Sequence, residues 1–84
     1  MAQADELKMA IKAYILDVFL PGEDPDELEE TTPLISGGIL DSISTVKLVA
    51  FLEEHFDVEF QAHEMSADYL DTISRIAETV KSKQ

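Results

Sequence analysis

Apolar residues recur every three or four positions along three stretches of the chain. Because an α-helix turns once in about 3.6 residues, this spacing places the apolar side chains on one face. It predicts helices over residues 5–20 and 42–56, and a last helix that begins at residue 71 or 72. The apolar faces are formed by Leu7, Ile11, Tyr14, Ile15 and Val18, by Leu48, Val49, Leu52 and Phe56, and by Ile73, Ile76, Ala77 and Val80.

Residues at the ends of these stretches agree with the spacing. Pro21-Gly22 ends the first helix, since proline cannot continue the hydrogen-bond ladder and glycine favours a turn. Short polar side chains stand where each helix begins. The expected N-caps are Asp5, Asp41 and, for the last helix, Asp71 or Thr72.

The long segment between the first two helices, residues 23–36, is expected to be an irregular connection. It is acidic, and Pro25 and Pro33 prevent a continuous helix. A connection of this length is uncommon inside a compact domain, so apolar residues should hold it to the core. Those residues are Leu28, Leu34, Ile35 and Leu40.

The segment after the second helix completes the predicted fold. Residues 57–60 are expected to form an extended link that buries Val58 and Phe60, and a short helix is expected near 63–69. The fold class is therefore all-α. We expect a small four-helix bundle of three longer helices and one short helix, with a long loop between helices 1 and 2.

Composition limits the classes of partner. The length of 84 residues suits one domain, expected to span 1–84. There are 18 acidic residues against 6 basic ones, a formal net charge of −12, which disfavours nucleic acid and anionic membranes as partners. The expected partners are enzymes with basic docking patches, and the chain is expected to be a monomer.

The chain contains no cysteine, which excludes a protein thiolate as nucleophile. Neither a secretory signal pattern nor an apolar run long enough to span a bilayer is present, so a cytoplasmic location is expected. No metal site is expected either, because His63 with Glu64 or Asp68 lacks a standard ligand spacing.

The second helix carries two apolar stripes. With Ser42 set at zero and ~100° per residue, the core face lies at roughly 240–340°. A second strip lies beside Ser42 at roughly 40–100°, with two carboxylates farther along the same side. Either both stripes are buried, or the second is a docking surface, which the position of Ser42 favours. The residues of this side are Ile43, Val46, Ala50, Glu53 and Glu54, whereas Phe51 fits neither stripe and has no explanation.

Ser42 follows a Gly-Gly loop and stands at the first helical position, because Asp41 already supplies the capping oxygen. The nearest candidate base, His55, is about 20 Å away along the helix axis, and the Gly-x-Ser-x-Gly motif is absent, so self-contained hydrolysis is disfavoured. An anionic group on Ser42 would instead gain roughly 0.3–1 kcal/mol from the helix dipole. The position favours a point of covalent attachment.

Residues 38–57 (GILDSISTVKLVAFLEEHFD) resemble the acyl carrier protein family, which includes peptidyl and aryl carriers. The Asp-Ser-Leu motif of that family stands here as Asp41-Ser42-Ile43, and its Leu-Glu-Glu-x-Phe pattern ends the second helix. Tyr69, Thr72, Ile73 and Ile76 match its later part. The resemblance implies a non-enzymatic carrier with phosphopantetheine on Ser42. A separate phosphopantetheinyl transferase would transfer it from coenzyme A using Mg²⁺.

The same resemblance implies roles for the residues around Ser42. Asp41 would assist the transferase, and acyl-loading and acyl-processing enzymes would dock on the second helix. Many family members carry acids where this chain has Ser44 and Lys47, a difference that would select other partner enzymes. The implied docking residues are Ile43, Val46, Lys47, Ala50, Glu53 and Glu54.

The cargo stays open at this point. One interpretation is a carrier of acyl intermediates as thioesters for fatty acid, polyketide or related biosynthesis. The alternative is a free-standing aminoacyl, peptidyl or D-alanyl-type carrier. A different class of function is an acidic helical interaction module without a prosthetic group, in which Ser42 merely starts a helix.

Overall fold

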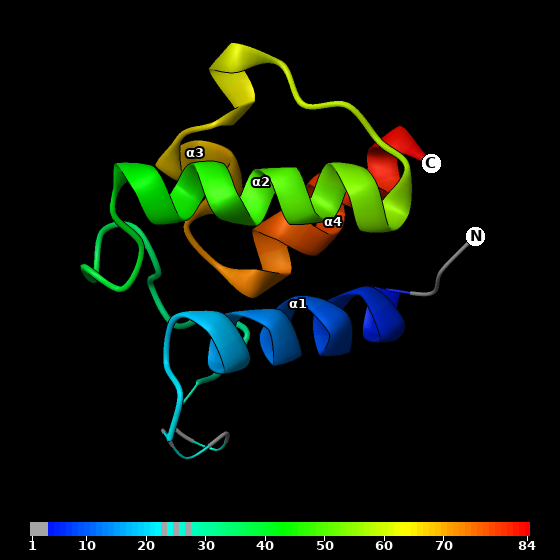
Figure 1. Cartoon of the computed structure of the whole chain (residues 1–84). Coiled ribbons are helices and arrows are strands. Elements are labelled where there is room, and N and C mark those ends of the chain that lie inside the picture. Colours follow the sequence, from blue (N-terminus) through cyan, green and yellow to red (C-terminus); the bar gives the residue numbers. More distant parts are fainter. Residues whose placement is uncertain (1–3, 23, 25, 27) are drawn as a thin grey trace.

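The computed structural model describes residues 4–22, 24, 26 and 28–84 and is all-helical over those residues. The helices are α1 (Ala4–Val18), α2 (Ser42–Phe56), α3 (Ala67–Leu70) and α4 (Ile73–Lys83), and a 3₁₀ turn, η2, spans Ala62–Glu64. In Figure 1, α1 and α2 run in opposite directions, and α4 crosses between them. The predicted bundle of three longer helices and one short helix, with a long loop between the first two, is confirmed.

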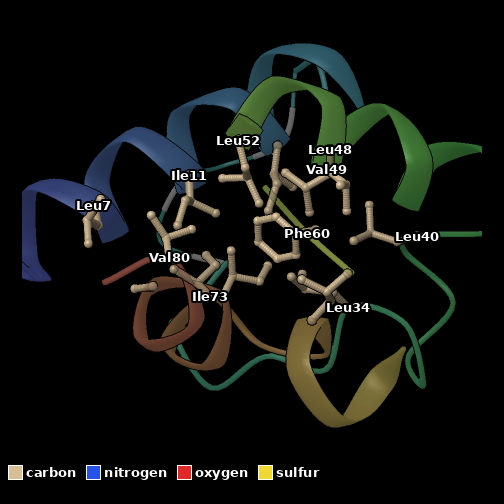
Figure 2. Close-up of a cluster of buried hydrophobic side chains, with 14 of the residues drawn as sticks. Leu7, Ile11, Leu34, Leu40, Leu48, Val49, Leu52, Phe60, Ile73 and Val80 are labelled. Carbon is tan, nitrogen blue, oxygen red and sulfur yellow. The ribbon is translucent and has the colours of Figure 1, made fainter. Parts of the chain in front are cut away.

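The core is built from the apolar faces that the spacing predicts, together with residues of the connections. Leu7, Ile11 and Ile15 of α1 are buried with the inner face of α4. Figure 2 shows Phe60, from the link after α2, pointing into the middle of this cluster. Leu28, Leu34, Leu40 and Phe60 are buried, while Ile35 and Val58 are half-buried against the core, so the predicted anchors are confirmed.

Two details of α1 differ from the prediction. The helix begins at Ala4, so Asp5 lies inside the first turn and is not the N-cap. It ends at Val18, where the Ile15 carbonyl accepts the Phe19 amide at 2.9 Å in the helical spacing and also the Leu20 amide at 3.1 Å, one residue beyond that spacing. Val18, predicted on the buried apolar face, is instead exposed, and Phe19 and Leu20 pack against the core beyond the helix end.

The predicted short helix near residues 63–69 is replaced by two separate turns, η2 and α3. The Glu64 carboxylate accepts the Gln61 amide at 2.8 Å and completes a tight 3₁₀ turn. A new turn then begins at Ser66, whose carbonyl accepts the Leu70 amide at 2.9 Å. Because each turn is closed by its own hydrogen bonds, the segment does not form one continuous helix.

The start of α4 decides between the two caps that the sequence allows. The Thr72 hydroxyl accepts the Arg75 amide at 3.1 Å, so Thr72 is the N-cap and Asp71 has another role. Pro25, which was expected to interrupt the long connection, lies outside the described residues. No helix in the described part of the chain is both long and apolar enough to cross a membrane.

Candidate functional site

Asp41 sets the start of α2. Its carboxylate accepts the Ser44 amide at 2.7 Å, and its carbonyl accepts the Thr45 amide at 2.9 Å and the Thr45 hydroxyl at 2.7 Å. The Ser44 amide, followed by the Ser44 side chain, holds the pKa of Asp41 below its ordinary value. The predicted N-cap is confirmed, and Asp41 stays ionised near neutral pH beside Ser42.

Ser42 is the first residue of α2 and is exposed. Because Asp41 supplies the cap, the Ser42 hydroxyl is not required for starting the helix. The amides of Ser42 and Ile43 belong to the first turn of α2 and have no carbonyl four residues earlier within the helix. An anionic group attached to this oxygen would therefore lie at the positive end of the helix dipole.

The glycine pair before Ser42 has a structural reason. A Cβ on Gly37 would collide with the Pro33 carbonyl oxygen, and Gly38 has a φ of +83°, a conformation that other residues rarely adopt. Two backbone hydrogen bonds close the loop. The Gly38 amide donates to the Ile35 carbonyl at 3.1 Å, and the Leu40 amide donates to the Leu34 carbonyl at 2.9 Å. The two glycines thus permit the turn that delivers the chain to the start of α2.

Asp71 ties this loop to the far end of the sequence. Its carboxylate accepts the Ile35 amide at 2.9 Å, the Ser36 amide at 2.8 Å and the Ser36 hydroxyl at 2.8 Å. The Ser36 amide is the main cause that lowers the pKa of Asp71 from its ordinary value. Sequence reasoning considered Asp71 as a helix cap and missed this role, because its partners lie 35 and 36 residues away.

A hollow of about 470 Å³ opens beside Ser42, between the start of α2 and the segment that joins η2 to α3. Its walls are mostly apolar, with polar groups close to Ser42. The residues that line it are Ile35, Leu40, Asp41, Ser42, Thr45, Val46, Met65, Ser66 and Ala67. A flexible group attached to the Ser42 oxygen would find this hollow directly next to its point of attachment.

The second apolar stripe of α2 is exposed. Ile43 is 68% exposed and Val46 is 54% exposed, and Ala50, Lys47 and Glu54 are exposed as well. The interpretation that both stripes are buried is therefore wrong. We call this surface the outer face of α2, defined by Ile43, Val46, Lys47, Ala50 and Glu54.

Glu53 differs from the other residues expected on that surface. It is half-buried, and its carboxylate accepts the Phe60 amide at 2.9 Å, so it holds the link after α2 in place. The chain can make this link because Asp57 adopts a left-handed conformation, with φ of 55°, at the end of α2. The structure thus removes one of the two predicted carboxylates from the outer face and leaves Glu54.

The structure also explains Phe51 and the two histidines. The Phe51 ring stacks on Tyr14 of α1, with centroids 4.0 Å apart, and on the His55 ring at 5.0 Å. Phe51 therefore joins α1 to the side of α2 rather than belonging to either stripe. His63 lies edge-on to Tyr69, and no cluster of potential metal ligands occurs among the described residues.

Comparison with known proteins identifies the family. The family model described as "Phosphopantetheine attachment site" matches residues 11–80. The chain belongs to this family of phosphopantetheine-bearing carrier proteins. It is a carrier and not an enzyme, and its prosthetic group is covalently attached phosphopantetheine.

Several similar proteins have the same name. A D-alanyl carrier protein from Streptococcus uberis is 32% identical over 78 residues, which cover 90% of this chain and 98% of the relative. One from Lactobacillus acidophilus is 31% identical, covering 88% and 95%. One from Streptococcus sanguinis is 34% identical, covering 86% and 92%.

The residues at the start of α2 fit the prosthetic group of this family. The Ser42 hydroxyl is exposed, the first amides of the helix can stabilise a phosphodiester, and the neighbouring hollow is next to the point of attachment. When bound, the group supplies a thiol that this cysteine-free chain does not encode.

Proposed function

We propose that Ser42 is the residue to which phosphopantetheine is attached, and that the chain is a free-standing D-alanyl-type carrier. The observation that carries the attachment site is the exposed hydroxyl on the first residue of a helix that Asp41 already caps. The cargo is supported by relatives named D-alanyl carrier proteins that match over most of their length. These relatives favour an aminoacyl cargo over the fatty acyl or polyketide cargo that is the other interpretation.

In this proposal the chemistry at Ser42 is a single substitution at phosphorus. The Ser42 oxygen forms a bond to the phosphate of coenzyme A that bears the pantetheine, and the pyrophosphate bond breaks. Adenosine 3′,5′-bisphosphate leaves, and the hydroxyl proton passes to a base of the transferase or to water. Asp41, ionised beside Ser42, would help to hold Mg²⁺, which would neutralise charge on the phosphates.

The role of the folded chain after this step is presentation. Residues 1–84 form one carrier domain, and the outer face of α2 is the surface on which the transferase and the loading enzyme dock. Only weak, transient contact is required, because the carrier must leave one enzyme to reach the next. The residues assigned to docking are Ile43, Val46, Lys47, Ala50 and Glu54, with Glu53 at their inner edge.

The attachment site is tested by intact-protein mass spectrometry. The apo protein is incubated with coenzyme A, Mg²⁺ and a broad-specificity phosphopantetheinyl transferase, and the expected result is a gain of one phosphopantetheine. Ser42→Ala should abolish the gain. Ser44→Ala, which removes a hydroxyl from the same helical turn, is the matched control and should retain it. A gain that survives Ser42→Ala contradicts the assignment.

The cargo is tested on the modified protein. With ATP and a D-alanine-activating ligase, the holo form should gain one alanyl group that hydroxylamine removes, as expected for a thioester. L-alanine with the same ligase, and a medium-chain fatty acid with an acyl ligase, are the comparison reactions. Preferential loading of the fatty acid would overturn the D-alanyl proposal while leaving Ser42 as the attachment site.

A further inference from the structure

The surface that meets the modifying enzyme follows from the position of Ser42. An active site that reaches the Ser42 oxygen must lie against the first turns of α2, since Ser42 is the first residue of the helix. At ~1.5 Å of rise per residue, Lys47 lies about 7.5 Å along the axis from Ser42, and Glu54 about 18 Å. Lys47 is therefore inside the footprint of the enzyme, whereas Glu54 lies at its edge.

Within this footprint the outer face of α2 carries a positive charge, although the whole protein is strongly negative. The chain has a formal charge of −12, yet Lys47 is the one charged residue in the sequence from 42 to 52. Glu53, the next acid, is half-buried, accepts the Phe60 amide and lies about 9 Å farther along the helix axis than Lys47. Asp41 precedes the helix beside Ser42, where the proposed function assigns its carboxylate to Mg²⁺ and not to a side chain of the enzyme.

The apolar residues around Lys47 complete the pattern. Ile43 lies one turn before Lys47 and Ala50 three residues after it, so both are its neighbours on the helix surface, and Val46 lies beside them; all are exposed. A cation surrounded by exposed apolar side chains is poorly matched by a basic partner, because like charges would be brought together as water is removed. It is well matched by an apolar surface that contains a carboxylate.

We propose that the phosphopantetheinyl transferase of the source organism meets α2 with a surface of two parts. Near the active site, an apolar patch contains a carboxylate that pairs with Lys47. Basic residues of the enzyme contact the carrier only farther along the helix, opposite Glu54. This proposal rests on Ser42 being the attachment site, and it replaces a uniformly basic docking patch, which the total charge of the chain predicts.

The experiment compares two charge reversals whose signs separate the two kinds of partner surface. Apo wild type, Lys47→Glu and Glu54→Lys are modified by the transferase of the source organism with coenzyme A, and initial rates are measured by intact mass. A two-part surface is expected to raise KM for both variants, by roughly threefold to tenfold each, with kcat little changed. A uniformly basic surface would instead lower KM for Lys47→Glu while raising it for Glu54→Lys.

Matched controls remove the effect of net charge. Lys81→Glu and Glu78→Lys change the charge by the same amounts at exposed positions of α4, and Lys81 lies in its last turn, away from the start of α2 in Figure 1. They should change KM less than twofold. Circular dichroism should show that all four variants keep the helical fold.

The possible failures are distinguishable. No mass gain on wild type, or a gain that survives Ser42→Ala, removes the proposed attachment site. Normal modification at Ser42 together with an unchanged or lowered KM for Lys47→Glu overturns the carboxylate partner alone. A rise in KM equal to that of Lys81→Glu overturns it too, because the effect would then come from net charge.

Discussion

The inner and outer faces of α2 are both apolar, but the inner face is buried and the outer face is exposed. On the inner face, Leu48 and Leu52 are fully buried and Val49 is nearly so. On the outer face, Ile43 and Val46 are mostly exposed. The two sets of side chains are similar in size and hydrophobicity and belong to the same 15-residue helix, so the helix itself does not decide which face is buried.

Which face of α2 is buried depends on which face other parts of the chain pack against. The inner face belongs to one buried cluster with side chains of α1 and α4 and with side chains from the connections, including Leu34, Leu40 and Phe60 (Figure 2). Phe51 uses the side of the helix to contact Tyr14 of α1. The outer face is left to solvent. An exposed apolar surface that is next to a candidate attachment site is typical of a contact for another protein.

The largest expected difference between the two faces is in stability. Leu52→Ala should lower the free energy of unfolding by about 2–4 kcal/mol, because it removes buried methyl groups and leaves a cavity. Val46→Ala on the outer face should change it by less than about 0.5 kcal/mol. Urea denaturation followed by circular dichroism measures both. Equal losses would mean that the outer face is packed in solution.

A smaller effect is expected at the loop that leads to Ser42. Asp71→Ala should cost about 2 kcal/mol, because the two amides and one hydroxyl that its carboxylate accepts lose their partner. Asp71→Asn, which keeps an acceptor oxygen, should cost less. The measurement is again urea denaturation at neutral pH.

The same residue carries a pH dependence whose sign follows from its lowered pKa. The Asp71 pKa is lower in the folded protein than its ordinary value of 3.8. Its stabilising contribution is therefore complete above that value and is lost as the pH falls from there through the folded pKa. The difference in stability between wild type and Asp71→Asn should shrink over this acidic range. A constant difference would contradict the role of the ionised carboxylate.

The smallest expected effect separates two adjacent carboxylates at the boundary of the faces. Glu53→Ala should cost about 1 kcal/mol, since the Phe60 amide loses its acceptor, whereas Glu54→Ala should stay within about 0.5 kcal/mol. Thermal denaturation of both variants in the same buffer provides the measurement. Equal melting temperatures would contradict the structural role of Glu53 and would leave it available as a docking residue.

Sequence reasoning was most successful where structure depends on near neighbours. The bounds of α2, the Asp41 cap and the position of Ser42 at the first helical residue are all confirmed. The anchors of the long connection are confirmed as well. Large apolar residues isolated in a polar segment are usually buried in the core, so they could be recognised from the sequence. The resemblance to carrier proteins rests on this same stretch, and the family match supports it.

Prediction from the sequence was less successful where a local pattern was compatible with two structures. The segment near residues 63–69 forms two closed turns in place of one helix, since Glu64 caps the first turn and also pairs with Lys83, 2.6 Å away. Asp5 and Thr72 are both predicted as N-caps, but of these two only Thr72 is an N-cap in the structure.

The sequence by itself determined the helices, the start of α2 and the hydroxyl that stands there, because these depend on residues within about four positions of one another. The tertiary structure decided that the second apolar stripe is left exposed, which the position of Ser42 had only favoured. It alone decided that Glu53 accepts the Phe60 amide and that Asp71 secures the loop before Ser42. Those outcomes depend on contacts between residues far apart in the chain, such as Ser36 and Asp71. Their partners are brought together only by packing, so no local pattern encodes them.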